Sequence, residues 1–184
     1  MKLDKSQALT LLKTHIQNEN LRRHCLSVGI VMKALAEKLG GDPQEWEILG
    51  IIHDSDWEET KDNPDQHTVV TLGRIDDPRF THALQSHNTH HTHLAELEGN
   101  MEWALECCDE LTGFIVAVAL VRPEKKLETV TVESVLKKWK TKEFAKAVNR
   151  TQIAQCEEKL KIPLTEFIQI TLAAMQNHHE ELGL

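Results

Sequence analysis

Two histidines and two aspartates in this chain have the residue types and the spacing of metal ligands. His53 and Asp54 are adjacent at the end of a short apolar stretch, while His24 and Asp109 lie far from them in the sequence. Imidazole nitrogens and carboxylate oxygens bind divalent cations such as zinc, iron and manganese. If folding brings these four side chains together, they can hold one ion.

Helical periodicity indicates that these residues face the protein interior. His24 shares a helix face with Leu21 and Val28, and Asp109 shares one with Leu105, in each case by steps of three or four residues. An unpaired carboxylate near a hydrophobic core costs several kcal/mol, so a positive charge must lie beside it. The sequence therefore predicts a cation between three helices.

The elements that must position these residues are predicted to be helices throughout. Nearly every segment has the apolar spacing and the end signals of a helix, and no stretch alternates long enough to favour a strand. The fold class is therefore all-α, with a polar loop over 55–64 covering the mouth of the site. The expected first or capping residues of the helices are Ser6, Asn20, Asp42, Asp65, Asp77 and Asn100. In the last third we expect helical segments over 131–139 and 142–148, around Ile153, and from Thr165 to Met175.

Composition narrows the class of protein further. The chain has 184 residues, which suit one domain, and its 29 acidic and 21 basic side chains give a net charge of −8. This charge disfavours binding to a nucleic-acid polymer. No signal peptide or bilayer-spanning run is found, so a cytoplasmic protein without a membrane partner is expected. The four cysteines form no CxxC pair and are expected to be reduced and buried; the oligomeric state is left open.

The order of the four ligand-type residues resembles that of the HD superfamily of metal-dependent phosphohydrolases. The resemblance rests on His24, on residues 49–56 (LGIIHDSD) and on residues 104–113 (ALECCDELTG). It covers roughly the first two thirds of the chain, and its specificity comes from the placement of the His-Asp pair rather than from the dipeptide itself.

The resemblance implies a single HD-type helical bundle over residues 1–184. Its metal-site helices would lie at about 20–122, and helices at about 131–180 would pack around them. It also implies that His24, the His53-Asp54 pair and Asp109 bind a divalent metal, which the sequence leaves open among Mn, Co, Ni, Fe, Mg and Zn.

Whether one ion or two are bound is a further question raised by the resemblance. Superfamily members with two metals place additional histidines between the doublet and the last aspartate, and this chain has His67 and His87 there. Asp54 would then bridge the two ions. Asn88 stands where some of these proteins carry another histidine, so one ligand of the second ion would be weaker or missing.

For a phosphohydrolase, metal-activated water attacks the phosphate ester, and no protein nucleophile is required. The sequence has no nucleophile elbow and no P-loop. Besides Asp54, the expected catalytic carboxylates are Asp56 and Glu58, either of which could protonate the leaving oxygen, and Arg22 or Arg23 could bind the phosphate. The expected substrate is a small phosphate ester or nucleotide.

Two other classes share this ligand pattern. HD-type di-iron oxygenases use a similar set of histidines and aspartates for oxidative bond cleavage, and the ligands alone do not separate the two chemistries. A noncatalytic helical module that senses a nucleotide and keeps the metal for structure is the third possibility, which a complete ligand set argues against.

Overall fold

The computed structural model describes residues 2–184, and this part of the chain contains helices and turns but no strand. The predicted all-α class is therefore confirmed. The helices are α1 (Lys5–His15), α2 (Glu19–Leu39), α3 (Pro43–Ile52), α4 (Trp57–Thr60), α5 (Val69–Arg74), α6 (Pro78–His87), α7 (Thr89–Thr92), α8 (Asn100–Leu120), α9 (Val132–Trp139), α10 (Arg150–Lys159), α11 (Leu164–Asn177) and α12 (His179–Leu182), with short 3-10 turns at Pro64–Gln66 and Leu127–Thr129.

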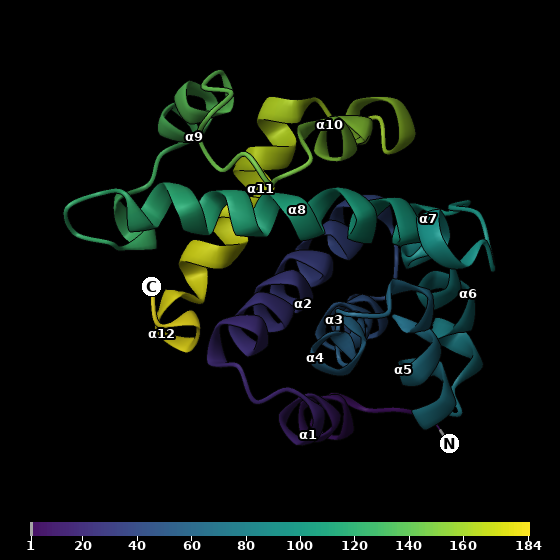
Figure 1. Cartoon of the computed structure of the whole chain (residues 1–184). Coiled ribbons are helices and arrows are strands. Elements are labelled where there is room, and N and C mark those ends of the chain that lie inside the picture. The colour runs from purple at the N-terminus through teal and green to yellow at the C-terminus, as the bar shows by residue number, and fades with distance from the viewer. Residues whose placement is uncertain (1) are drawn as a thin grey trace.

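The long helix α8 divides the molecule. In Figure 1 it runs across the middle, with α2, α3 and α1 below it, α9 and α10 above it, and α5 to α7 at one end. One continuous set of buried apolar side chains, contributed by both sides of α8, forms the core. Of residues 2–184, no helix is both long and apolar enough to cross a membrane.

Two glycines bring α2 and α3 into close contact, and this contact positions the candidate ligands. A Cβ atom added at Gly50 would lie 2.6 Å from the Cα of Gly29, so the two helix backbones touch where they cross. His24 precedes this crossing by more than one turn on α2, while His53 follows it directly on α3. The crossing therefore holds the two imidazoles near each other.

The predicted helix starts are confirmed at the two places where an aspartate precedes a proline. Asp42 and Asp77 each accept backbone N–H hydrogen bonds from the first turn of the helix that follows, as expected for caps. Other predicted starts are wrong by one or two residues: the helices that were expected to begin at Ser6, Asn20 and Asn100 are capped by Asp4, Asn18 and Gly99.

One predicted helix starts later than expected, and another is absent. Asp65 lies within a 3-10 turn, and the next helix begins only at Val69, because Thr68 has a left-handed backbone with φ of 69°. Residues 142–148 form turns instead of a helix. The Arg150 guanidinium, from the start of α10, donates to the carbonyl oxygens of Phe144 and Ala145 in this segment.

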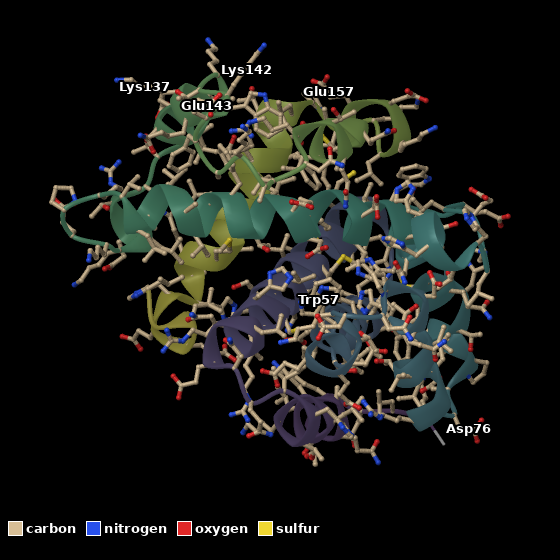
Figure 2. All side chains as sticks on the ribbon, in the orientation of Figure 1. Trp57, Asp76, Lys137, Lys142, Glu143 and Glu157 are labelled. Carbon is tan, nitrogen blue, oxygen red and sulfur yellow. The ribbon has the colours of Figure 1, made fainter. Side chains whose placement is uncertain are left out.

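Exposed charged side chains lie on the side of α8 that faces away from α2. Figure 2 shows Lys137, Lys142 and Glu143 projecting together from the end of the molecule that α9 forms, while Trp57 lies on the opposite side of α8. Both signs of charge are present there, as expected for a solvated surface rather than a phosphate-binding one. The four cysteines are buried and free, as predicted.

Candidate metal centre

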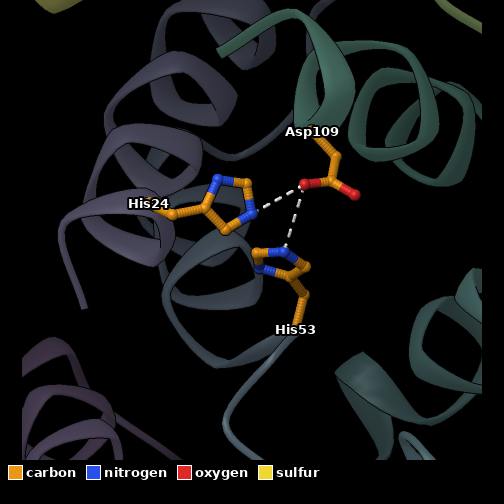
Figure 3. A group of neighbouring side chains, drawn as sticks. All are labelled: His24, His53 and Asp109. Carbon is orange, nitrogen blue, oxygen red and sulfur yellow. Dashed lines mark ion pairs between the residues drawn. The ribbon is translucent and has the colours of Figure 1, made fainter. Parts of the chain in front are cut away.

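Three helices bring the first group of ligand-type side chains together. His24 lies in the second turn of α2, His53 caps the C-terminal end of α3, and Asp109 lies in the middle of α8 (Figure 3). The Oδ1 atom of Asp109 lies 2.8 Å from Nε2 of His24 and 3.5 Å from Nε2 of His53. One ligand atom of each residue can thus point at a common centre, as the sequence predicted.

His53 is held with one ring nitrogen directed at this centre. Its side chain is completely buried, and its Nδ1 lies 2.8 Å from the carbonyl oxygen of Gly50, to which it donates a hydrogen bond. The other nitrogen, Nε2, is buried and has no hydrogen-bond partner. A neutral imidazole fixed in this tautomer presents a lone pair to two carboxylates, which is favourable only if a cation or a proton lies between them.

In the metal-free protein, a proton replaces that cation. Burial disfavours the charged ring and lowers the pKa of His53, but the nearby negative charges of Asp54 and Asp109 outweigh burial and raise this pKa to about 9. Burial likewise acts to raise the pKa of Asp109, yet its contacts with His24 and His53 hold that pKa well below its usual range. The site is therefore built to contain positive charge.

A second group of ligand-type side chains lies against the same Asp54 carboxylate. His67 follows the 3-10 turn at Pro64–Gln66, and His87 ends α6. Their Nε2 atoms lie 3.2 Å and 3.7 Å from Oδ1 of Asp54. The rings of His53 and His87 are also neighbours, with centroids 5.1 Å apart, so the two groups are contiguous.

Asp54 faces both groups with different oxygen atoms. Its Oδ2 atom lies 3.8 Å from Nε2 of His24 and 3.7 Å from Nε2 of His53, whereas its Oδ1 atom faces His67 and His87. Ligand atoms placed about 2.0–2.2 Å from one ion lie about 3–3.5 Å from each other, so small adjustments suffice for coordination. Burial would raise the pKa of Asp54, but the surrounding imidazoles lower it far more. Each oxygen of this carboxylate therefore faces a different pair of imidazoles.

Asp56 lies behind the site and not at its mouth, which corrects the sequence-based expectation. It is fully buried, and its Oδ1 atom accepts a hydrogen bond from Nδ1 of His67 at 2.8 Å while its Oδ2 atom accepts one from the backbone N–H of Thr71. This carboxylate fixes the ring of His67 so that its Nε2 faces Asp54. Burial acts to lower the pKa of His67, but the carboxylates of Asp54 and Asp56 raise it more, so the pKa of His67 is raised to about 9. Asp56 is thus a positioning residue.

Two other predicted site residues have structural roles away from the ligands. Both carboxylate oxygens of Glu58 accept backbone N–H hydrogen bonds, from Gln17 and Asn18, so Glu58 closes the turn between α1 and α2. Arg22 donates through Nε to the carbonyl oxygen of Ile16 and through Nη2 to that of Lys13. Glu58 is therefore not placed to donate a proton to a substrate, and Arg22 is not placed to bind a phosphate.

Unlike Glu58 and Arg22, Arg23 and Asn88 lie close to the candidate ligands. Arg23 is half exposed and lines a cavity beside His24, so its predicted role near a substrate remains compatible with the geometry. Asn88 donates from Nδ2 to the carbonyl oxygens of Pro64 and His67. It holds the segment that carries His67 instead of acting as a ligand itself.

An open cavity of about 360 Å³ lies over the two groups of ligands. Besides His24, Asp54, His67, His87 and Asp109, its lining contains Trp57, Glu110, Gly113 and Val148. Trp57 and Glu110 were not predicted as site residues, although Trp57 lies three residues beyond Asp54 and Glu110 directly follows Asp109. Burial and the neighbouring Asp109 charge raise the pKa of Glu110. Because the cavity reaches the ligand atoms, a small molecule can approach the centre.

Comparisons of the chain with protein-family models, with curated proteins and with solved structures found no match. The class of site therefore rests on the geometry. Among the candidate ligands, two sets of three have ligand atoms within 4.8 Å of one another and could hold a metal ion. The sets are His24, His53 and Asp109, and His53, Asp54 and His87, and they share His53. The structure is that of an all-α protein with a candidate metal centre of histidines and aspartates.

Proposed function

We propose that this protein is a metal-dependent phosphohydrolase of the HD type, which cleaves a small phosphate ester or nucleotide. The observation that carries this proposal is the Asp54 carboxylate, which directs one oxygen at each of two pairs of imidazoles beneath an open cavity. Two ions about 3.5–4 Å apart are the usual arrangement for hydrolysis of phosphate esters. A carboxylate placed between two such ions can bind both of them.

When bound, the metal ions would polarise the phosphoryl oxygens and activate water for attack. His24, His53 and Asp109 would hold one ion. His67 and His87 would hold the other, and Asp54, which faces both pairs of imidazoles, would be shared. The Gly50 carbonyl and the Asp56 carboxylate fix the tautomers of His53 and His67, since each accepts a hydrogen bond from Nδ1.

The size and charge of the site favour a small anionic substrate. The chain has a net charge of −8, so attraction of a phosphate must come from the centre itself and from nearby cations such as Arg23. The leaving oxygen needs a proton donor that faces the cavity. Glu110 replaces Asp56 and Glu58 in this role, because its side chain lines the cavity. Its Oε2 atom accepts a hydrogen bond from the backbone N–H of Asn149, whereas both carboxylate oxygens of Asp56 and of Glu58 are bonded within the protein.

The proposal is tested by a screen of phosphate esters with protein loaded with Mn, Co, Ni, Fe, Zn or Mg. We expect release of phosphate that depends on added metal and that is abolished in Asp54→Asn. The variant Glu58→Gln serves as the matched control, since Glu58 is a nearby carboxylate outside the site. In heavy-oxygen water, a single turnover should place solvent oxygen in the released phosphate. A trapped phosphorylated side chain would exclude the mechanism.

The same second ligand group favours one alternative, an HD-type di-iron oxygenase. Imidazole and carboxylate ligands also suit iron, and a shared carboxylate between two ions fits that chemistry equally well. Metal analysis of protein purified without added metal discriminates the two. Two irons per chain together with no phosphatase activity under any metal would favour the oxygenase.

A further inference from the structure

A second cavity of about 310 Å³ adjoins the metal centre on the side of α2 and α8. It shares His24 and Gly113 with the cavity over the ligands, so the two spaces meet at these residues. Its other walls come from Asn20, Arg23, Ser27, Thr112, Val116, Leu120 and Leu184. A molecule bound at the metal centre can therefore extend past Gly113 into this second space.

Gly113 lies at the boundary between the two cavities. It lies inside α8, one helical turn beyond Asp109, where glycine costs about 1 kcal/mol relative to alanine. A Cβ atom added there would meet no other atom within 4 Å, so close packing does not explain the glycine. A larger side chain at this position would project into the space that the two cavities share.

Most of the surface area that lines the second cavity is apolar, although Asn20, Arg23 and His24 also belong to its walls. Val116 and Leu184 contribute to its walls, and Leu120 is 48% exposed at its edge although it is a large apolar side chain. Two polar groups of the lining are already bonded within the protein, since the Ser27 hydroxyl donates to the carbonyl of Arg23 and the Thr112 hydroxyl donates to that of Asp109. Such walls recognise shape and apolar surface.

We propose that this cavity binds the organic group of the substrate, and that this group is a compact apolar one, such as an aromatic ring or a branched aliphatic chain. The inference rests on the proposed function, because it assumes that a phosphate occupies the metal centre. The volume lies at the lower end for ligand cavities, which favours a single compact group over a whole nucleoside. The substrate class would then be a phosphomonoester of an apolar alcohol.

Two non-hydrolysable phosphonates test this inference by binding alone. Phenylphosphonate and methylphosphonate carry the same anionic group and differ only in the apolar part, so titration calorimetry with manganese-loaded protein measures what the second cavity adds. We expect phenylphosphonate to bind at least about tenfold more tightly, because the ring buries apolar surface. Methylphosphonate provides the reference for the metal centre.

Three variants test whether the preference for phenylphosphonate comes from the second cavity. Gly113→Leu should remove the preference for phenylphosphonate, and Leu120→Ser, at the far edge, should weaken it while leaving methylphosphonate binding unchanged. Gly73→Leu is the matched control, because Gly73 is also an exposed helical glycine with open space at its Cβ position, but it lines neither cavity. It should bind both compounds as the unmodified protein does.

The outcomes separate this inference from the proposed function. If neither phosphonate binds the loaded protein, the proposed function is contradicted. If both bind with equal affinity, or if the preference survives in both Gly113→Leu and Leu120→Ser, the metal centre stands and the second cavity is not the site of the organic group.

Discussion

The two ligand groups that share Asp54 are built in different ways. His24, His53 and Asp109 come from α2, α3 and α8, and α2 packs directly on both α3 and α8. His67 lies between a 3-10 turn and the short helix α5, and His87 ends α6. One group is positioned by helix packing, and the other depends on connecting segments.

The difference shows what each kind of scaffold needs. The ring of His53 requires only the carbonyl of its own helix at Gly50, because burial fixes the rest. The segment of His67 is held by side chains instead, through Asp56 on its ring and Asn88 on its carbonyl. His87 has no such partner, since its Nδ1 is buried without a hydrogen bond. We therefore expect the second ion to be held more weakly than the first.

Replacement of the shared residue should have the largest effect. Asp54→Ala removes one ligand from each group, so we expect metal content to fall from two ions per chain to none after dialysis. Elemental analysis measures the content, and circular dichroism verifies that the helices remain. A folded variant that retained full metal occupancy would show that Asp54 is not a ligand.

Removal of His67 or His87, the ligands on the loop-borne side of Asp54, should cost one ion per chain instead of two. His87→Ala should lose one ion and retain the other, whereas His24→Ala should disturb the tighter of the two. Stepwise titration with manganese resolves the two affinities. Loss of both ions in His87→Ala would mean that the two groups bind as one unit and that the distinction drawn between them is wrong.

The orienting carboxylate should have a smaller and selective effect. Asp56→Asn keeps the size of the side chain but weakens the hold on His67, and loss of such an outer hydrogen bond typically lowers metal affinity by about 10- to 100-fold. We expect this loss for the second ion alone. Glu58→Gln, measured in the same titration, is the control and should leave both affinities unchanged. Equal weakening of both ions in Asp56→Asn would contradict the assignment.

The pH dependence should be the most gradual effect. The pKa values of His53 and His67 are raised to about 9 in the metal-free protein, from an ordinary 6.5. Their charged forms therefore stabilise the metal-free fold fully below pH 6.5, and this contribution is lost as pH rises through 9. Metal binding must displace these protons, so affinity should rise with pH by about tenfold per unit for each proton released.

Calorimetric titrations in buffers of different protonation enthalpy count the released protons. We expect release of at least one proton per chain at pH 7. Binding without proton release, and with an affinity that is flat between pH 7 and 8, is the result that this account does not allow.

The helix-borne part of the site could be predicted from the sequence. The three-to-four spacing of apolar residues around His24 and Asp109 fixes which face is buried, and packing of those faces brings the residues together. The all-α class follows from the same periodicity. The start of α3 was predictable because Asp42 and Pro43 act through local geometry alone.

The loop-borne part could be predicted only as a set of candidates. Asp56 was expected at the mouth because the segment after Asp54 is polar, but its carboxylate turns inward to the Thr71 N–H, a contact 15 residues away. Glu58 likewise bonds to the chain 40 residues earlier. Such long-range hydrogen bonds leave no periodic signal. The turns over 142–148 were missed because the Arg150 side chain bonds to the carbonyl oxygens of Phe144 and Ala145, and such side-chain bonds to the backbone also leave no periodic signal.

The position of Asp54 between two ions is the central claim, and anomalous scattering from crystals soaked in manganese tests it most directly. The account predicts two peaks about 3.5–4 Å apart on either side of the Asp54 carboxylate. One should lie beside His24, His53 and Asp109, and the other beside His67 and His87. A single peak at saturating manganese, or two peaks that Asp54 does not touch, would contradict it.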